Sequence, residues 1–129
     1  MSAPSDAFAA LLLAHVLLGL ALGLRVITLR LKHGVGIGDG ENRPLRRAIR
    51  AHGNYAEWVP LSLLALAAAD LRGAPEAWIM GLGGAMLISR LMHGVGLSRS
   101  GGAGLLRQGG MTVSLLALLA AAVLSSLKN

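Results

Sequence analysis

Hydrophobic residues fall into four long stretches, separated by short polar or glycine-rich segments. The pattern predicts membrane-spanning helices at about residues 6–31, 44–70, 75–97 and 105–127. Short connections place consecutive helices antiparallel to one another. We therefore predict an all-α integral membrane protein, a four-transmembrane-helix up-down bundle that forms a single domain over residues 1–129.

The second stretch differs from the others because its purely apolar part, which begins near Trp58, is too short. It holds only about a dozen residues, whereas a bilayer core requires ~20. The helix must extend back through polar positions, which at membrane depth normally face a protein interior or a wet cavity. At ~100° per residue, six of them share one stripe. They are Arg43, Arg46, Arg47, Arg50, Asn54 and Glu57. The stripe predicts a site, and Pro60 predicts a kink beyond it.

The composition supports a membrane protein and excludes several functions. The chain is 54% hydrophobic, 14% charged and 3% aromatic, with a mean hydropathy of +0.64, unlike a soluble domain. It has no cysteine, which excludes a disulfide framework and a thiol nucleophile, so any thiol chemistry must come from a ligand. The net charge is +6, but the basic residues flank apolar spans and few aromatic rings accompany them, which argues against nucleic-acid binding.

The basic residues are distributed unevenly between the two ends of the predicted bundle. The chain start lacks a basic region, so the first stretch is expected to be a retained span, capped by Asp6. One end carries Arg30, Lys32, Arg43, Arg46, Arg47, Arg50, Arg99 and Arg107. The other carries Arg72 and Lys128. By the positive-inside rule, both termini are periplasmic and the site faces the cytoplasm.

The third and fourth spans add polar residues at the same end. Arg90 and His93 are three residues apart, so they share a helix face. Arg107 lies in the first turn of the fourth span, where the positive partial charge of a helix N-terminus also favours an anion.

The first loop, residues 32–42, is rich in glycine but follows a helix and lacks a P-loop ending, so a turn with Asp39–Gly40 at its tip is expected. Asp39 and Glu41 are too few to hold a metal ion, and no metal is expected.

Two motifs carry a family resemblance. Residues 50–60, RAHGNYAEWVP, together with residues 90–93, RLMH, resemble the MAPEG family, the membrane-associated proteins in eicosanoid and glutathione metabolism. The short loops and the GDG at residues 38–40 are most similar to its small bacterial branch. The resemblance covers nearly the whole chain. It implies a homotrimer in the bacterial inner membrane that binds glutathione as co-substrate between subunits.

The resemblance also implies site residues and an activity. The expected glutathione ligands are Arg30, Arg50, Asn54, Glu57, Arg90 and His93, and the expected catalytic residue is Arg107, which would stabilise the thiolate. Arginine suits the two glutathione carboxylates, and Glu57 could pair with the ammonium. Several eicosanoid-type members have a tyrosine where this chain has Leu97. This difference favours general glutathione transferase or peroxidase activity toward a lipophilic molecule from the bilayer.

Two other functions are compatible with the residues. The first is a non-catalytic lipid- or anion-binding or scaffold protein of the same fold, in which Glu57 pairs with Arg50 or Arg90. The excess of arginine at that end argues against it, since unpaired buried charge is destabilising. The second is a small transporter, whose only candidate for an essential acid would be Glu57.

Overall fold

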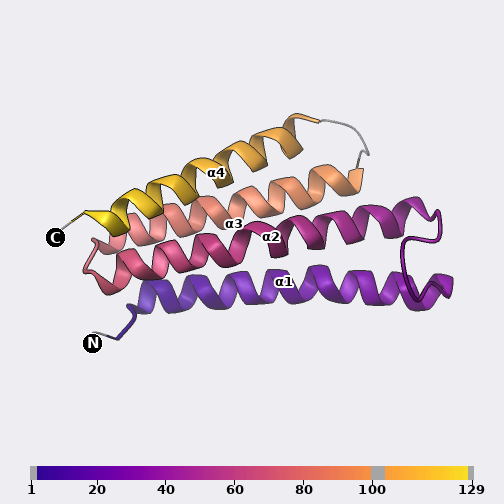
Figure 1. The fold of residues 1–129 in the computed structure, drawn as a ribbon, viewed down its shortest axis with the longest axis horizontal. Coiled ribbons are helices and arrows are strands. Elements are labelled where there is room, and N and C mark those ends of the chain that lie inside the picture. The colour runs from indigo at the N-terminus through magenta and orange to yellow at the C-terminus, as the bar shows by residue number, and fades with distance from the viewer. Residues whose placement is uncertain (1–2, 100–103, 128–129) are drawn as a thin grey trace.

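The chain folds into four long helices that lie side by side (Figure 1). A computed structural model describes residues 3–99 and 104–127. The helices are α1 (Asp6–His33), α2 (Arg43–Leu71), α3 (Glu76–Arg99) and α4 (Leu105–Ser126), with no strand in the described residues. The predicted all-α fold is confirmed, and each helix end lies within two residues of its expected position.

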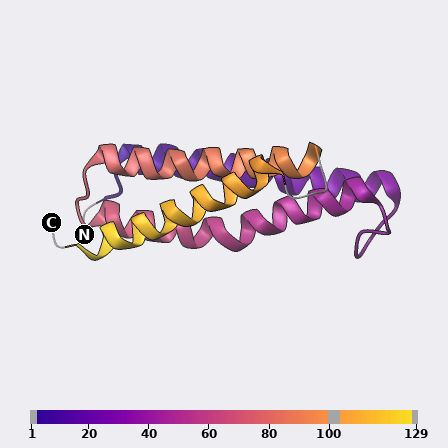
Figure 2. The same cartoon turned by 90° about the horizontal axis from the view of Figure 1, so that it is seen from above.

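The helices run alternately up and down, so both termini lie at one end of the bundle (Figures 1 and 2). The α1–α2 loop lies at the other end. There, α1 and α2 extend beyond α3 and α4 in both views. The first turn of α2, which begins at Arg43, therefore projects past the end of α3 (Figures 1 and 2).

Three helices are long and apolar enough to cross a membrane, namely α1, the part of α3 over Glu76–Leu97, and α4. The fourth, α2, has sufficient length but carries the charged stripe. It nevertheless continues as one helix through Pro60. Apolar composition therefore supports three of the four predicted spans, and α2 depends on its neighbours to cover its polar face.

The N-cap of α1 is Ser5, and the prediction of Asp6 is wrong by one residue. The Ser5 hydroxyl accepts a hydrogen bond from the Phe8 N–H at 3.1 Å and donates to Asp70 Oδ1 at 2.5 Å. The Ser5 N–H donates to Asp70 Oδ2 at 2.8 Å. A serine oxygen satisfies an otherwise unpaired N–H of the first turn, and here it also joins the start of α1 to the end of α2.

The α1–α2 loop contains the predicted turn. The Asn42 N–H donates to the Asp39 carbonyl at 2.9 Å, and the two residues between them, Gly40 and Glu41, both have positive φ. This is the geometry of a type I′ turn, so the turn is confirmed, with its tip at Gly40–Glu41, one residue beyond the expected Asp39–Gly40. The expected third loop, residues 98–104, and Lys128 lie largely outside the described residues.

The interior of the bundle changes from apolar to polar along its length. Near the termini the core is built from apolar side chains, among them Phe8, Leu11, Leu66 and Ile79. Farther toward the α1–α2 loop, the buried residues include Arg90 and other polar side chains, His15, Ser89 and His93. Buried polar groups require partners. The partner of Arg90 is Asn54, which lines the candidate site described below.

Candidate functional site

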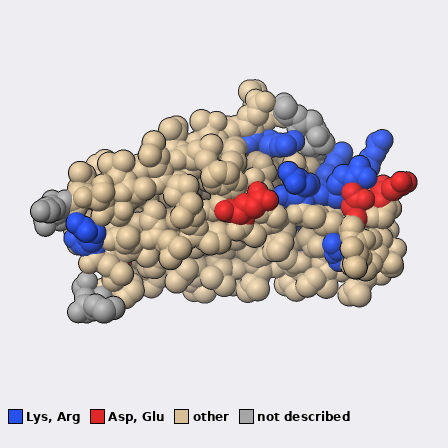
Figure 3. Space-filling model, in the orientation of Figure 1, with Lys and Arg blue, Asp and Glu red and all other residues tan. Residues whose placement is uncertain are grey.

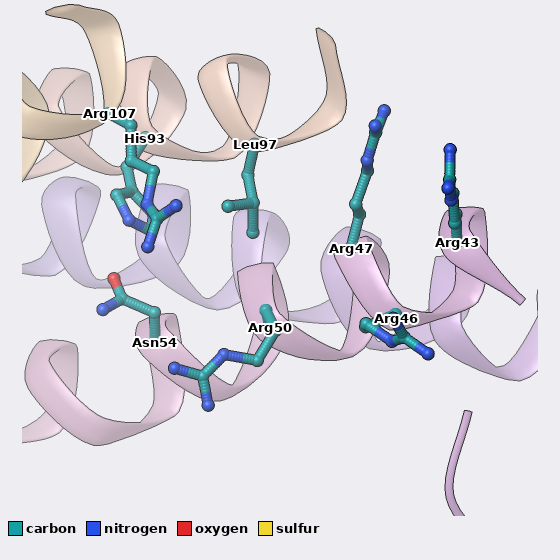
Figure 4. A pocket seen from close by; sticks show the side chains of 8 residues that line it. All are labelled: Arg43, Arg46, Arg47, Arg50, Asn54, His93, Leu97 and Arg107. Atoms are coloured by element: carbon teal, nitrogen blue, oxygen red, sulfur yellow. The ribbon is translucent and has the colours of Figure 1, made fainter. Parts of the chain in front are cut away.

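A cavity of ≈ 450 Å³ opens at the polar end of the bundle, between α2, α3 and α4 (Figure 4). It is lined by Arg43, Arg46, Arg47, Arg50, Asn54, His93, Leu97 and Arg107. Five of these described residues are arginines and none is acidic. Guanidinium groups bind carboxylates and phosphates in bidentate fashion, so the cavity is suited to an anion.

The α2 stripe forms one side of this cavity because its residues recur on a single helix face. Five of its six members line the cavity. In Figure 4, Asn54 points toward His93 and Arg107, whereas Arg50 points away from Arg107. The sixth member, Glu57, is exposed and does not line the cavity.

His93 and Arg107 share the opposite wall because α4 begins very close to α3. A Cβ on Gly110 would lie 2.6 Å from the Ser89 carbonyl oxygen, and a Cβ on Gly96 would lie 3.0 Å from the backbone nitrogen of Arg107. Neither position has room for a side chain unless the backbone moves. The two glycines therefore set the position of Arg107 relative to His93. The sequence shows that these residues are small, but it does not show which helix they contact.

Arg90 lies behind this wall rather than in it. Its side chain is only 3% exposed. Nη1 donates to Asn54 Oδ1 at 2.6 Å, and Nη2 contacts the Met111 sulfur at 3.8 Å. The Asn54 amide nitrogen contacts the same sulfur at 3.9 Å. In this protomer Arg90 holds Asn54 in place, and Met111, an apolar residue that sequence reasoning missed, completes the cluster.

Arg30 occupies a different position from the other predicted ligands. Its Nη1 donates to the carbonyls of Val35 and Gly36 at 3.3 and 3.0 Å, which fixes the loop after α1. Arg30 and Arg50 meet in a second cavity of ≈ 220 Å³, completed by Gly38, Asp39, Arg46 and Ile49. Arg46 and Arg50 line both cavities and lie between them.

Opposite charge is scarce at this end of the molecule. Lys and Arg side chains gather there (Figure 3). Asp39 pairs with Arg46, and the guanidinium holds the pKa of the Asp39 carboxyl below its usual range. Within the described protomer neither Arg50 nor Arg90 forms an ion pair with Glu57. The ion pairs assumed for a purely structural network are therefore not formed in one protomer.

The structure thus brings four of the seven predicted site residues together in one cavity, namely Arg50, Asn54, His93 and Arg107. Arg90 lies one layer behind, and Arg30 and Glu57 lie outside. No group of three His, Cys, Asp or Glu side chains that could hold a metal ion occurs in the described part of the chain.

Comparison with known proteins supports the family resemblance that the sequence motifs indicated. Residues 8–127 match the model of the MAPEG family. Inner membrane protein YecN of Escherichia coli strain K12 is 38% identical over 69 residues, which are 53% of this chain and 52% of YecN. YecN of E. coli O6:H1 strain CFT073 matches to the same extent. The chain spans about half the length of these curated relatives. Because the family model covers nearly the whole sequence, the chain belongs to the MAPEG family.

Proposed function

We propose that this protein binds glutathione in the arginine-lined cavity and transfers it to lipophilic electrophiles, as a glutathione transferase. A hydroperoxide among these substrates would make it a peroxidase. The observation that carries the proposal is the meeting of Asn54, His93 and Arg107 in one cavity of ≈ 450 Å³. These side chains come from three helices, and the family resemblance implies Asn54 and His93 as glutathione ligands and Arg107 as the catalytic residue.

The cavity supplies the charges that glutathione needs. Its two carboxylates can be bound by arginines, with Arg50 at the junction of the two cavities. Asn54, fixed by Arg90, presents its amide to the peptide part. Both interactions orient the thiol toward the wall formed by α3 and α4.

Arg107 is the proposed thiolate-stabilising residue. A free thiol has a pKa of ~8.5, and neighbouring cations lower it. Lowering it by ~2 units corresponds to ~2.7 kcal/mol of preferential thiolate stabilisation. Arg107 lies in the first turn of α4, where the helix N-terminus adds positive partial charge. The thiol proton leaves to water, the sulfur forms a bond to the electrophilic carbon, and that carbon releases its leaving group.

A homotrimer would complete the site. Glu57 is exposed on one protomer although α2 places it near membrane depth, and an ionised side chain facing lipid is costly. Contact with a neighbouring subunit would cover Glu57 and bring it to the ammonium of glutathione bound there. We place the protein in the bacterial inner membrane with both termini periplasmic. The name of the YecN relatives and the concentration of basic residues at one end support this placement.

An ultraviolet difference spectrum with glutathione, recorded on the purified protein in detergent at neutral pH, tests the proposal. We expect a saturable thiolate absorbance that Arg107→Ala abolishes and Arg107→Lys retains in part. Arg72→Ala removes the same charge at the other end of the bundle and should leave the signal unchanged.

The result also separates catalysis from simple binding. Glutathione binding by calorimetry without thiolate absorbance would contradict the transferase and leave the alternative, an anion- or lipid-binding protein of the same fold. A normal thiolate signal in Arg107→Ala would show that the role assigned to Arg107 is wrong.

A further inference from the structure

The sulfur of Met111, on α4, lies between hydrogen-bond donors from two other helices. Arg90 Nη2 of α3 contacts it at 3.8 Å, and Asn54 Nδ2 of α2 contacts it at 3.9 Å. A thioether is a weak acceptor. Arg90 is almost fully buried, and within the described part of the chain its one short hydrogen bond is the bond to Asn54. The two donors around the Met111 sulfur are therefore poorly satisfied, and an oxygen atom bonded to that sulfur would accept from both.

A thioether gains such an oxygen when a hydroperoxide oxidises it to a sulfoxide. The sulfur lone pair attacks the outer oxygen of the peroxide, so an S–O bond forms and the O–O bond breaks. The sulfur loses two electrons, the hydroperoxide is reduced to an alcohol, and the proton of the outer oxygen passes to the leaving oxygen. Negative charge develops on that leaving oxygen, and a guanidinium beside it lowers the barrier. Arg90 Nη2 lies close enough to Met111 to have this effect.

Met111 is accessible to a small hydroperoxide. Its side chain is partly exposed, and the next two residues of α4, Thr112 and Val113, are exposed. Its contact Asn54 also lines the cavity of ≈ 450 Å³. By contrast, Met86 is almost fully buried in the apolar core. Access and neighbouring N–H donors therefore coincide at Met111.

We propose that Met111 is an oxidation site, at which a lipid hydroperoxide converts the thioether to a sulfoxide whose oxygen accepts hydrogen bonds from Arg90 and Asn54. Methionine oxidation commonly disrupts a protein core because it places a polar group among apolar ones. At Met111 the donors are already present, so the sulfoxide holds α4 more firmly against α2 and α3. Enzymes reduce methionine sulfoxide, so the change is reversible.

The rate of oxidation of each methionine tests this proposal. The full-length protein in detergent would be treated with cumene hydroperoxide and followed by peptide mass spectrometry. Met92 is the matched reference, because it is also partly exposed and lies close to α4, but its sulfur accepts no hydrogen bond within the described residues. We expect Met111 to be oxidised roughly tenfold faster than Met92, a factor that one charge-assisted hydrogen bond supplies.

Met80 controls for simple access because it is 48% exposed. If exposure alone governs the reaction, Met80 is oxidised faster than Met111, and that order would overturn the proposal. Asn54→Asp tests the donors, since it keeps an acceptor for Arg90 but removes the N–H that contacts the sulfur. It should lower the ratio of the Met111 rate to the Met92 rate several-fold. An unchanged ratio would also count against the proposal.

Thermal unfolding of the oxidised protein gives the second readout. Wild-type protein oxidised at Met111 should unfold at a higher temperature than untreated protein. Met111→Gln, whose amide oxygen is a permanent acceptor, should show the rise without oxidant. Met111→Leu has a similar size but no acceptor, and the same treatment should not raise its unfolding temperature.

The comparison with Met111→Leu decides the question even if Met111→Gln folds poorly. An unfolding temperature that falls on oxidation of the wild type and not of Met111→Leu would show that the sulfoxide disrupts the cluster, and the proposal would be wrong. Neither measurement involves glutathione. A missing thiolate spectrum would therefore count only against the proposed function.

Discussion

Arg90 donates a 2.6 Å hydrogen bond to Asn54, and this contact joins the buried interior of α3 to the cavity-facing side of α2. Arg90 is almost fully buried, and the other acceptors around its guanidinium are weak, a hydroxyl at 3.5 Å and a thioether at 3.8 Å. A buried cation depends on its acceptors. The same bond therefore stabilises the bundle and orients a cavity residue.

Replacing Asn54 should reveal both roles. Asn54→Ala removes the best acceptor of Arg90, and hydrogen bonds to charged groups are worth ~1.5–3 kcal/mol, so we expect the free energy of unfolding in mixed micelles to fall by about that amount. Asn54→Asp provides a carboxylate for Arg90 and should recover the stability. It also adds negative charge to the cavity and should weaken glutathione binding. If the unfolding free energy and the glutathione affinity fall together in both Asn54→Ala and Asn54→Asp, the two roles assigned to Asn54 are not separate.

The close contact between α3 and α4 gives a second prediction. Gly110→Ala places a methyl group 2.6 Å from the Ser89 carbonyl oxygen, so α4 must shift and carry Arg107 with it. The matched control is Gly109→Ala, whose methyl group would meet only Met92 at 3.9 Å. Both substitutions gain the same helix propensity, so their difference isolates the clash.

Relative to Gly109→Ala, we expect Gly110→Ala to lose ~1–3 kcal/mol of stability, the usual range for overpacking. Its glutathione thiolate absorbance should also be weaker at saturation. Equal stability and equal spectra for the two variants would show that α4 can adjust without moving Arg107.

Local sequence features predicted the helices well because hydropathy and helix capping act over a few residues. The helical period likewise placed most of the α2 stripe correctly, since five of its six members face one cavity. The packing between helices was not predictable in this way. Arg90 and His93 share a helix face by spacing, but their contacts with the neighbouring helices differ. Arg90 lies behind Asn54, whereas His93 lines the cavity.

Arg30 illustrates the same limit for loops. The family resemblance implied that it is a glutathione ligand, yet its side chain turns back onto the carbonyls of Val35 and Gly36. Whether an arginine binds a ligand or closes a helix end depends on the path of the following backbone. Gly34, at φ 64°, sets that path, and a glycine-rich sequence allows many others.

The contact between Ser5 and Asp70 predicts a stability effect at the other end of the bundle. Ser5→Ala removes both the helix cap and a hydrogen bond to Asp70. Loss of a serine cap costs ~0.5–2 kcal/mol, and we expect a decrease in unfolding free energy in this range. The glutathione spectrum should not change because the cavity lies at the opposite end. A spectral change would reveal coupling along the bundle that the static contacts do not explain.

Glu57 distinguishes a ligand-binding trimer from a structural ion network. It is exposed on the isolated protomer and lies on the same α2 stripe as Asn54. If it pairs with the glutathione ammonium across a subunit boundary, Glu57→Gln keeps the size and hydrogen-bonding capacity of the side chain but loses its charge. Charge-assisted hydrogen bonds are worth ~1.5–3 kcal/mol, so we expect roughly tenfold or greater weakening of glutathione affinity by calorimetry. The oligomer, measured by light scattering in detergent, should remain intact because the neutral side chain can still be buried between subunits. Dissociation of the oligomer with unchanged affinity per folded protomer would instead show that Glu57 holds the subunits together and takes no part in binding glutathione.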